Sequence, residues 1–157
     1  NDNNLTTLEN CPKIVEGNFD CRYNFLESLE GCPEIIEGSF SCNLNGLVDL
    51  KGGPKIVKGF FACDNNDLKS LEGFPEMING KIYCNNNKLN IEGLKFLPKE
   101  LKNNIDISNN KELGDFQNIE DFQELKEKVN IYLEKENLTN MINKEDLSNK
   151  DKVINKL

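Results

Sequence analysis

The chain has 157 residues, which suffices for one elongated domain but not for two globular domains of usual size. Acidic residues (27) outnumber basic residues (19), and no basic stripe interrupts the sequence. Binding to nucleic acid through phosphate neutralisation, or to an anionic membrane surface, is therefore disfavoured. The absence of histidine excludes an imidazole base, a His-based triad and histidine metal ligands.

Residues 1–111 are built from one repeating unit. Cysteines stand at Cys21, Cys42, Cys63 and Cys84, and every interval is 21 residues. Full repeats begin at Leu5, Leu26, Leu47, Leu68 and Leu89, and the fifth repeat gains two residues before Pro98. This spacing indicates a small supersecondary unit stacked on copies of itself. Residues 1–4 fit the end of an earlier unit, so we expect a truncated repeat, five repeats, and further sequence upstream.

The first part of each repeat carries leucines and a proline-containing arm. The leading leucines form one predicted buried stack, and a second stack follows at Leu8, Leu29, Leu50 and Leu71. Prolines at Pro12, Pro33, Pro54, Pro75 and Pro98 fix φ, so this arm should be extended or form a single 3₁₀ turn. Glycines follow at Gly17, Gly38, Gly59 and Gly80, and Asn103 replaces them in the fifth repeat. A glycine replaced only by asparagine predicts a positive φ at this position.

The second part of each repeat predicts a short strand and a polar turn. The alternation F-x-C has the period of two that a strand with one buried face shows. Three residues after each strand cysteine stands an asparagine, and the column comprises Asn24, Asn45, Asn66, Asn87 and Asn110. An asparagine amide offers both a donor and an acceptor, so we expect a ladder that bonds to the backbone of neighbouring turns.

The pattern L-x-x-L-x-x-C-P-x-x-I-x-G-x-F-x-C-x-x-N-x-L resembles leucine-rich repeats of the short bacterial and bacteriophage type. The resemblance covers residues 1–111, with phenylalanine and cysteine in place of leucine on the strand. It implies a curved solenoid with a parallel β-sheet on the concave side, an irregular or 3₁₀ convex arm, and the binding of other proteins. Because similar proteins are found in bacteria and large phages, it also implies a host-directed binder, such as an inhibitor of a host defence protein.

The six cysteines are predicted to be reduced. The strand column continues with Ile107, and the column of Cys11 and Cys32 continues with Gly53, Phe74 and Leu97, so cysteine behaves here as a small buried hydrophobe. Cysteines stacked in a line do not form a tetrahedron, so we expect no zinc site and no cofactor. Reduced thiols point to a cytoplasmic setting. Secretion or delivery into a host stays open, because the chain is expected to begin inside a repeat.

Residues 112–157 are predicted to form a helical cap or tail. Apolar residues recur three or four apart at Phe116, Ile119, Phe122, Leu125, Val129, Tyr132 and Leu133. This one-sided stripe predicts a helix of about five turns, with Asp115 as its N-cap. We expect the stripe to cover the open end of the solenoid, and the alternative is a docking helix for a partner. A further short helical piece is expected to end at Leu157.

Strand residues that alternate with the buried positions should form the concave face. Most are small and polar, whereas Phe60 and Tyr83 place aromatic rings on neighbouring rungs, as interface anchors do. The candidate partner-binding residues are Phe60, Tyr83, Tyr23, Arg22, Lys81, Asp20 and Asp64. Ordinary surface variation is the alternative explanation. No catalytic or metal-ligating residue is predicted.

These features favour a non-catalytic module that binds a protein partner through its concave face, with partner identity and oligomeric state left open. A competing possibility is a structural component of a larger assembly, for example a phage particle, that packs through its edges or convex side. A third is an enzyme whose catalytic part lies upstream. We expect no nucleic-acid or membrane partner.

Overall fold

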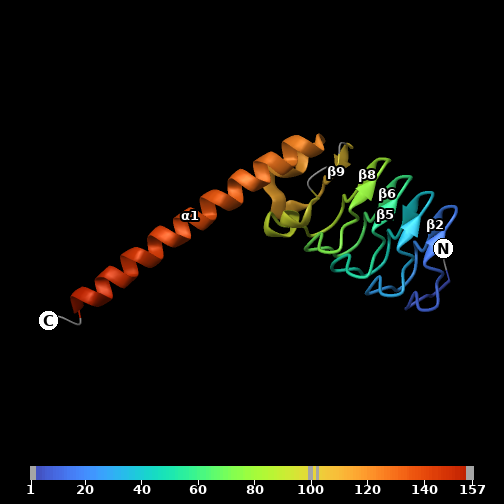
Figure 1. Ribbon diagram of the computed structural model, residues 1–157, viewed down its shortest axis with the longest axis horizontal. Helices are drawn as coiled ribbons and strands as arrows, with labels where there is room; N and C mark the ends of the chain where they lie inside the picture. The colour runs from blue at the N-terminus through green and yellow to red at the C-terminus, as the bar shows by residue number, and fades with distance from the viewer. Residues whose placement is uncertain (1–2, 99–100, 102, 155–157) are drawn as a thin grey trace.

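The computed structural model describes residues 3–98, 101 and 103–154, and it shows a parallel β-solenoid followed by one long helix (Figure 1). Each repeat forms one rung of the solenoid. A five-stranded sheet runs through all five rungs and consists of β2 (Phe19–Asp20), β4 (Phe40–Ser41), β6 (Phe61–Ala62), β8 (Ile82–Tyr83) and β9 (Ile105–Asp106). The expected parallel sheet is therefore confirmed.

The register of this sheet follows the sequence repeat directly. Phe19 pairs with Phe40, Phe40 with Phe61, and Phe61 with Ile82. The ring centroids of Phe40 and Phe61 lie 5.5 Å apart in a stacked arrangement. Because every strand pairs with the same positions of the next repeat, one rigid column of side chains forms on each face of the sheet.

The arm that follows each proline is more regular than expected. In the first four rungs it forms a second parallel sheet, which consists of β1 (Ile14–Val15), β3 (Ile35–Ile36), β5 (Ile56–Val57) and β7 (Met77–Ile78). In the fifth rung, the 3₁₀ helix η1 (Glu92–Phe96) lies before Pro98, in the stretch that carries the two extra residues. The extended form predicted from the prolines is thus confirmed for four rungs, whereas the irregular or 3₁₀ arm implied by the resemblance is wrong there, because extended pairs in register bond to one another.

The glycine columns exchange roles relative to the prediction. Positive φ occurs at Gly31, Gly52 and Gly73, and not in the column of Gly38. A Cβ on Gly80 would lie 2.6 Å from the carbonyl carbon of Gly59, so the preceding rung leaves no room for a side chain at this position of the fourth rung. Glycine there permits close stacking of rungs rather than an unusual backbone angle.

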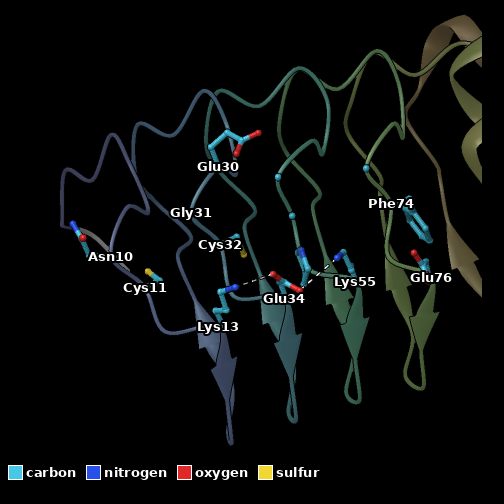
Figure 2. Close-up of a pocket in the computed structure, with 14 residues that line it drawn as sticks. Asn10, Cys11, Lys13, Glu30, Gly31, Cys32, Glu34, Lys55, Phe74 and Glu76 are labelled. Carbon is cyan, nitrogen blue, oxygen red and sulfur yellow. Dashed lines mark hydrogen bonds and ion pairs between the residues drawn. The ribbon is translucent and has the colours of Figure 1, made fainter.

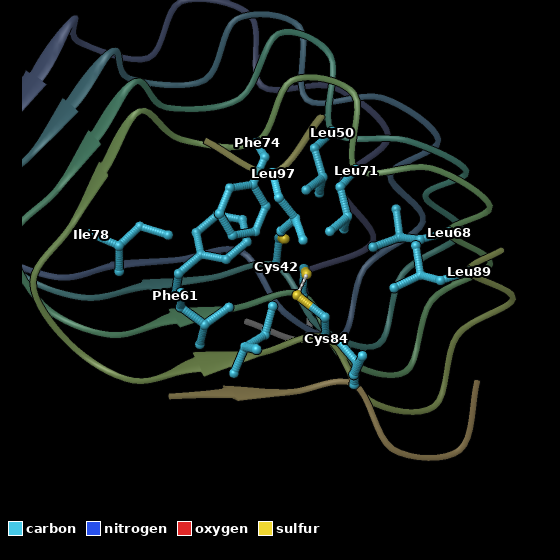
Figure 3. Packing of buried hydrophobic residues seen from close by; sticks show 14 of the residues in the cluster. Cys42, Leu50, Phe61, Leu68, Leu71, Phe74, Ile78, Cys84, Leu89 and Leu97 are labelled. Atoms are coloured by element: carbon cyan, nitrogen blue, oxygen red, sulfur yellow. Dashed lines mark hydrogen bonds between the residues drawn. The ribbon is translucent and has the colours of Figure 1, made fainter. Parts of the chain in front are cut away.

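The core is a continuous column of apolar side chains with thiols among them (Figure 3). Leu26, Leu47, Leu68 and Leu89 are fully buried, whereas Leu5, expected in the same stack, is 39% exposed. The strand cysteines are also buried, and all six cysteines are free thiols. Dispersion contacts between copies of the same residue therefore recur at each rung.

The asparagine column lies where the chain leaves the five-stranded sheet. The Asn66 Nδ2 donates to the carbonyl oxygens of Cys42 and Cys63, both at 3.1 Å, and its Oδ1 accepts from the Leu47 N–H at 3.2 Å. Similar bonds form at the other rungs, from Asn24, Asn45, Asn87 and Asn110. These amides satisfy backbone groups that no strand partner reaches.

The C-terminal segment begins differently from the prediction. A 3₁₀ segment, η2 (Lys111–Asn118), is interrupted at Gly114 with φ 54° and ψ −130°, and helix α1 (Phe122–Ile154) starts only after it. Asp121, rather than Asp115, caps the helix, since its Oδ1 accepts from the Glu124 N–H at 2.8 Å. Ile119, which ends η2 in an extended conformation (φ −89°, ψ 112°), prevents the apolar stripe from forming one helix from Phe116.

Helix α1 covers the end of the solenoid with its first turns only. Phe122, Leu125 and Val129 are buried and join the same core as the fifth rung, and the helix packs on η1. Beyond Leu133 it projects away from the rungs (Figure 1). The helix continues without a break to Ile154, and the predicted end at Leu157 lies outside the described residues.

Candidate functional site: the exposed face of the five-stranded sheet

The exposed face of the five-stranded sheet, here called the sheet face, presents the residues that alternate with the core. Its central column consists of Asp20, Ser41, Ala62, Tyr83 and Asp106. Ser41 and Ala62 are only 9% and 7% exposed. In the middle rungs the central column therefore presents little side-chain surface, with larger side chains only at particular positions.

Phe60, Tyr83 and Lys81 gather on rungs three and four, and we call them the aromatic cluster. The Phe60 and Tyr83 rings meet edge to face, with centroids 6.3 Å apart and planes at 81°. The Lys81 Nζ lies 5.6 Å from the centroid of the Tyr83 ring, within the range of a cation–π contact. Phe60 nevertheless remains 42% exposed. The cluster thus offers an apolar surface next to one positive charge.

The backbone under the aromatic cluster is fixed by bonds to three rungs. The Phe60 N–H donates to the Ser39 Oγ at 3.2 Å, and the Phe60 carbonyl accepts from the Phe40 N–H at 2.9 Å. The Tyr83 carbonyl accepts from the Cys63 N–H at 2.9 Å. Because these positions are held on both sides, the rings are presented with little conformational freedom.

The other candidate residues do not join this cluster. Arg22 and Asp20 form an ion pair with each other, with Nε and Oδ2 3.1 Å apart. Asp64 accepts a hydrogen bond of 2.6 Å from the Asn65 Nδ2. Tyr23 lies in the turn that leaves β2, where it lines a cavity with Phe25 and Leu44. The structure therefore brings three of the seven predicted residues together.

Phe25 is an exposed aromatic residue that the sequence interpretation missed. It is 65% exposed, more than Phe60 or Tyr23. The same position of later repeats holds Gly46, Asp67 and Lys88. An aromatic residue in an otherwise polar or small column was the signal that could have found it.

A second cavity, here called the large cavity, lies on the other side of the rungs, next to the four-stranded sheet (Figure 2). Its volume is about 570 Å³, and Cys11 and Cys32 lie in it. Lys13 and Lys55 each form an ion pair with Glu34 along its rim, at 3.8 and 3.4 Å. Burial raises the pKa of the Cys32 thiol, so this thiol stays protonated and is a poor nucleophile.

The core thiols are similarly unreactive. Burial, aided by the neighbouring Asp20 carboxylate, raises the pKa of Cys21 to about 12. Burial also raises the pKa of Cys42 and Cys63, and the Cys63 and Cys84 sulfur atoms lie 3.2 Å apart. Across the described part of the chain, no three cysteine, aspartate or glutamate side chains are grouped to hold a metal ion. These thiols act as packing groups.

None of the helices among the described residues has the length and apolar content that a membrane span requires. Comparison with protein-family models, with curated proteins and with solved structures finds no match to this chain.

Proposed function

We propose that this chain is a leucine-rich repeat protein that binds a partner protein, without catalysing a reaction, through the aromatic cluster of the sheet face. The observation that carries the proposal is the exposed Phe60 ring in edge-to-face contact with the half-buried Tyr83 ring on the sheet face. Aromatic residues bury a large area at low entropic cost and dominate the binding energy of many protein interfaces.

The surroundings of the cluster support a protein partner. Ser41 and Ala62, on rungs two and three of the central column, carry small side chains, which would let a partner surface pack against the neighbouring Phe60 ring. Lys81, next to Tyr83, supplies one charge that would orient an acidic group of the partner. The ion pair of Asp20 and Arg22 lies on the first rung, where a polar rim would surround the apolar centre.

The proposed absence of catalysis rests on the state of the nucleophiles. Burial raises the pKa of four cysteine thiols and keeps them protonated; these are Cys21, Cys32, Cys42 and Cys63. Lys13 and Lys55 along the large cavity pair with Glu34. Such groups stabilise rungs and supply no activated base or nucleophile.

The test is capture of a partner from the native source, followed by affinity measurement with purified proteins. The double variant Phe60→Ala, Tyr83→Ala should weaken binding at least about 30-fold, since hot-spot residues contribute about 2 kcal/mol or more each. Its thermal midpoint should stay near that of the parent protein, because both rings lie on the surface. Met77→Ala, an equally exposed apolar residue on the other sheet, is the matched control and should leave affinity unchanged.

Two results would contradict the proposal. Undiminished affinity in the double variant would remove the aromatic cluster from the interface. A loss of affinity in Met77→Ala alone would place the interface on the four-stranded sheet, as a structural component that packs through its arm would require.

A further inference from the structure

A second surface lies at the edge of the five-stranded sheet, in the turns that leave the first two strands. A cavity of about 490 Å³ there, here called the edge pocket, is lined by Asn4, Tyr23, Asn24, Phe25, Leu44, Asn45 and Asn65. Its size falls within the range of small-molecule sites. Every lining residue is uncharged, in a chain in which 29% of residues carry charge. The edge pocket therefore differs from the sheet face and from the large cavity, which both contain ion pairs.

The backbone at this edge has an unusual conformation for the side chains that it bears. One residue per rung has a positive φ, between 54° and 58°, and the column consists of Tyr23, Leu44, Asn65, Asn86 and Asn109. Asparagine tolerates this left-handed region, whereas tyrosine and leucine occupy it at a cost in free energy. Folding alone would favour asparagine on the first two rungs as well. Tyr23 and Leu44 thus point to a role other than stability.

The aromatic groups at this edge are turned to solvent. Tyr23 is 51% exposed, and Phe25, two residues later, is 65% exposed. Leu44 lies on the next rung and lines the same pocket. The apolar side chains are therefore concentrated on the two rungs in which the positive-φ position does not hold asparagine.

The polar groups of the edge pocket fall into two sets. The Asn24 and Asn45 amides are fully engaged with the backbone, since each donates to a carbonyl of its own rung and accepts from an N–H earlier in the chain, that of Leu5 or Leu26. Within the described residues, the Tyr23 hydroxyl, the Asn4 side-chain amide and the Asn65 Oδ1 have no hydrogen-bond partner, and these three residues line the cavity. A ligand would meet neutral donors and acceptors beside two aromatic side chains.

This lining selects for one ligand chemistry. A phosphate, nucleotide or acidic sugar would lose hydration without gaining an opposite charge, and a purely apolar group would leave the amides unpaired. A sugar ring presents an apolar face of C–H groups to an aromatic side chain and hydroxyl groups to amides. We propose that the edge pocket binds a neutral oligosaccharide through Tyr23, Phe25 and Leu44.

The test is titration of the isotope-labelled full chain with neutral di- and trisaccharides of glucose, galactose and N-acetylglucosamine, followed by amide NMR. At least one sugar should shift the resonances of residues 23–25 and 44–45 in a saturable manner. The double variant Tyr23→Asn, Leu44→Asn restores the residue of the lower rungs. It should reduce affinity at least about tenfold, a loss equal to 1.4 kcal/mol, while its thermal midpoint stays equal or rises. Phe60→Ala is the control and should bind as the parent does.

Three outcomes would overturn the proposal. The first is the absence of saturable shifts with every sugar of the panel. The second is binding that survives the double variant, which would place the sugar elsewhere. The third is equal affinity for a uronic-acid analogue, which would contradict selection by an uncharged lining. Shifts at residues 23–25 on addition of a protein partner, with none from sugars, would assign the edge pocket to that partner instead and leave the aromatic cluster to its own test.

Discussion

The solenoid and helix α1 bury their apolar residues in different ways. In the solenoid, Leu26, Leu47 and Leu68 are all fully buried, because each rung is covered by a copy of itself. In α1, only apolar residues near the start of the helix are buried. Leu125 is 0% exposed, whereas Leu138 and Met141, farther along, are 60% and 63% exposed. Stability in the solenoid is thus distributed over neighbouring rungs, while the helix depends on one contact at its start.

The two regions also differ in how backbone polar groups are satisfied. Each rung forms hydrogen bonds to the next through its strands and its asparagine amide. A substitution in one rung therefore affects its contacts with both neighbouring rungs. The projecting part of α1 has the hydrogen bonds of its own helix and contacts within its own turns, such as the bond from the Thr139 hydroxyl to the Lys135 carbonyl. Isolated helices of this kind are marginal in water. Substitutions should therefore be costly in the solenoid and its cap and nearly neutral beyond Leu133.

The largest effect is expected where the helix meets the solenoid. Leu125→Ala should lower the free energy of unfolding by about 3–4 kcal/mol, since it removes a fully buried side chain and leaves a cavity. Leu138→Ala, the same substitution four turns later, should change it by less than about 0.5 kcal/mol. Urea unfolding of both variants measures the difference. Equal losses would show that the projecting part of α1 packs against something, in contrast to its exposure.

A second prediction compares two glycines of the same column. Gly80→Ala should cost about 3 kcal/mol, because its Cβ would lie 2.6 Å from the Phe60 nitrogen and would push two rungs apart. Gly17→Ala should be neutral or slightly stabilising, since nothing lies within 4 Å of its Cβ and the unfolded chain loses freedom. Thermal unfolding distinguishes them. If both substitutions proved costly, backbone angle rather than stacking distance would explain the column.

The repeat made most of the fold predictable from sequence. Once Phe40 and Phe61 occupy the same column, their pairing in a parallel sheet follows, because identical units stack in register. The prediction of the glycine conformations failed because two physical reasons can each explain a glycine that recurs in every repeat. The glycine at 38 and the glycine at 31 both recur, and only the structure shows that the first makes room for a rung and the second has positive φ. Periodicity places residues in columns, but it does not state the reason for a residue type.

The candidate site was predictable to a smaller extent. Phe60 and Tyr83 were found because strand alternation assigns their face, and the structure shows their rings in contact. Tyr23 and Phe25 follow the strand, where alternation no longer assigns a face. Tyr23 lies in the turn, apart from the aromatic cluster, and Phe25 was missed. The start of α1 was misplaced, since the extended backbone at Ile119 interrupts a stripe whose spacing continues unchanged. Such breaks in the backbone leave little trace in the spacing of apolar residues.

The third prediction concerns the asparagine column. Asn66→Ala should cost about 2 kcal/mol, because the Leu47 N–H would lose its acceptor in a buried turn. The Cys42 and Cys63 carbonyls would each lose one of their two amide donors and keep the other, from Asn45 or Asn87. Asn79→Ala, an exposed asparagine on the arm, is the control and should change stability by less than about 0.5 kcal/mol. Chemical denaturation of the two variants provides the measurement. A cost for Asn66→Ala as small as that of the control would mean that water replaces the amide.

The smallest expected effect is a pH dependence of stability that arises from the buried thiols of the solenoid. Helix α1 contains no cysteine and does not contribute to it. Burial raises the pKa of Cys21 to about 12 and also raises the pKa of Cys42 and Cys63. Below the pKa of an unfolded thiol, both states are protonated and stability is unaffected; above it, only the unfolded state releases protons. Stability should therefore fall as the pH rises above about 9, by up to about 1.4 kcal/mol per pH unit for each buried thiol. Cys42→Val removes one such thiol. The urea midpoint of this variant should therefore decline less steeply than that of the parent protein between about pH 9 and pH 10.5. Parallel slopes would show that the Cys42 thiol ionises as readily in the folded state as in the unfolded state.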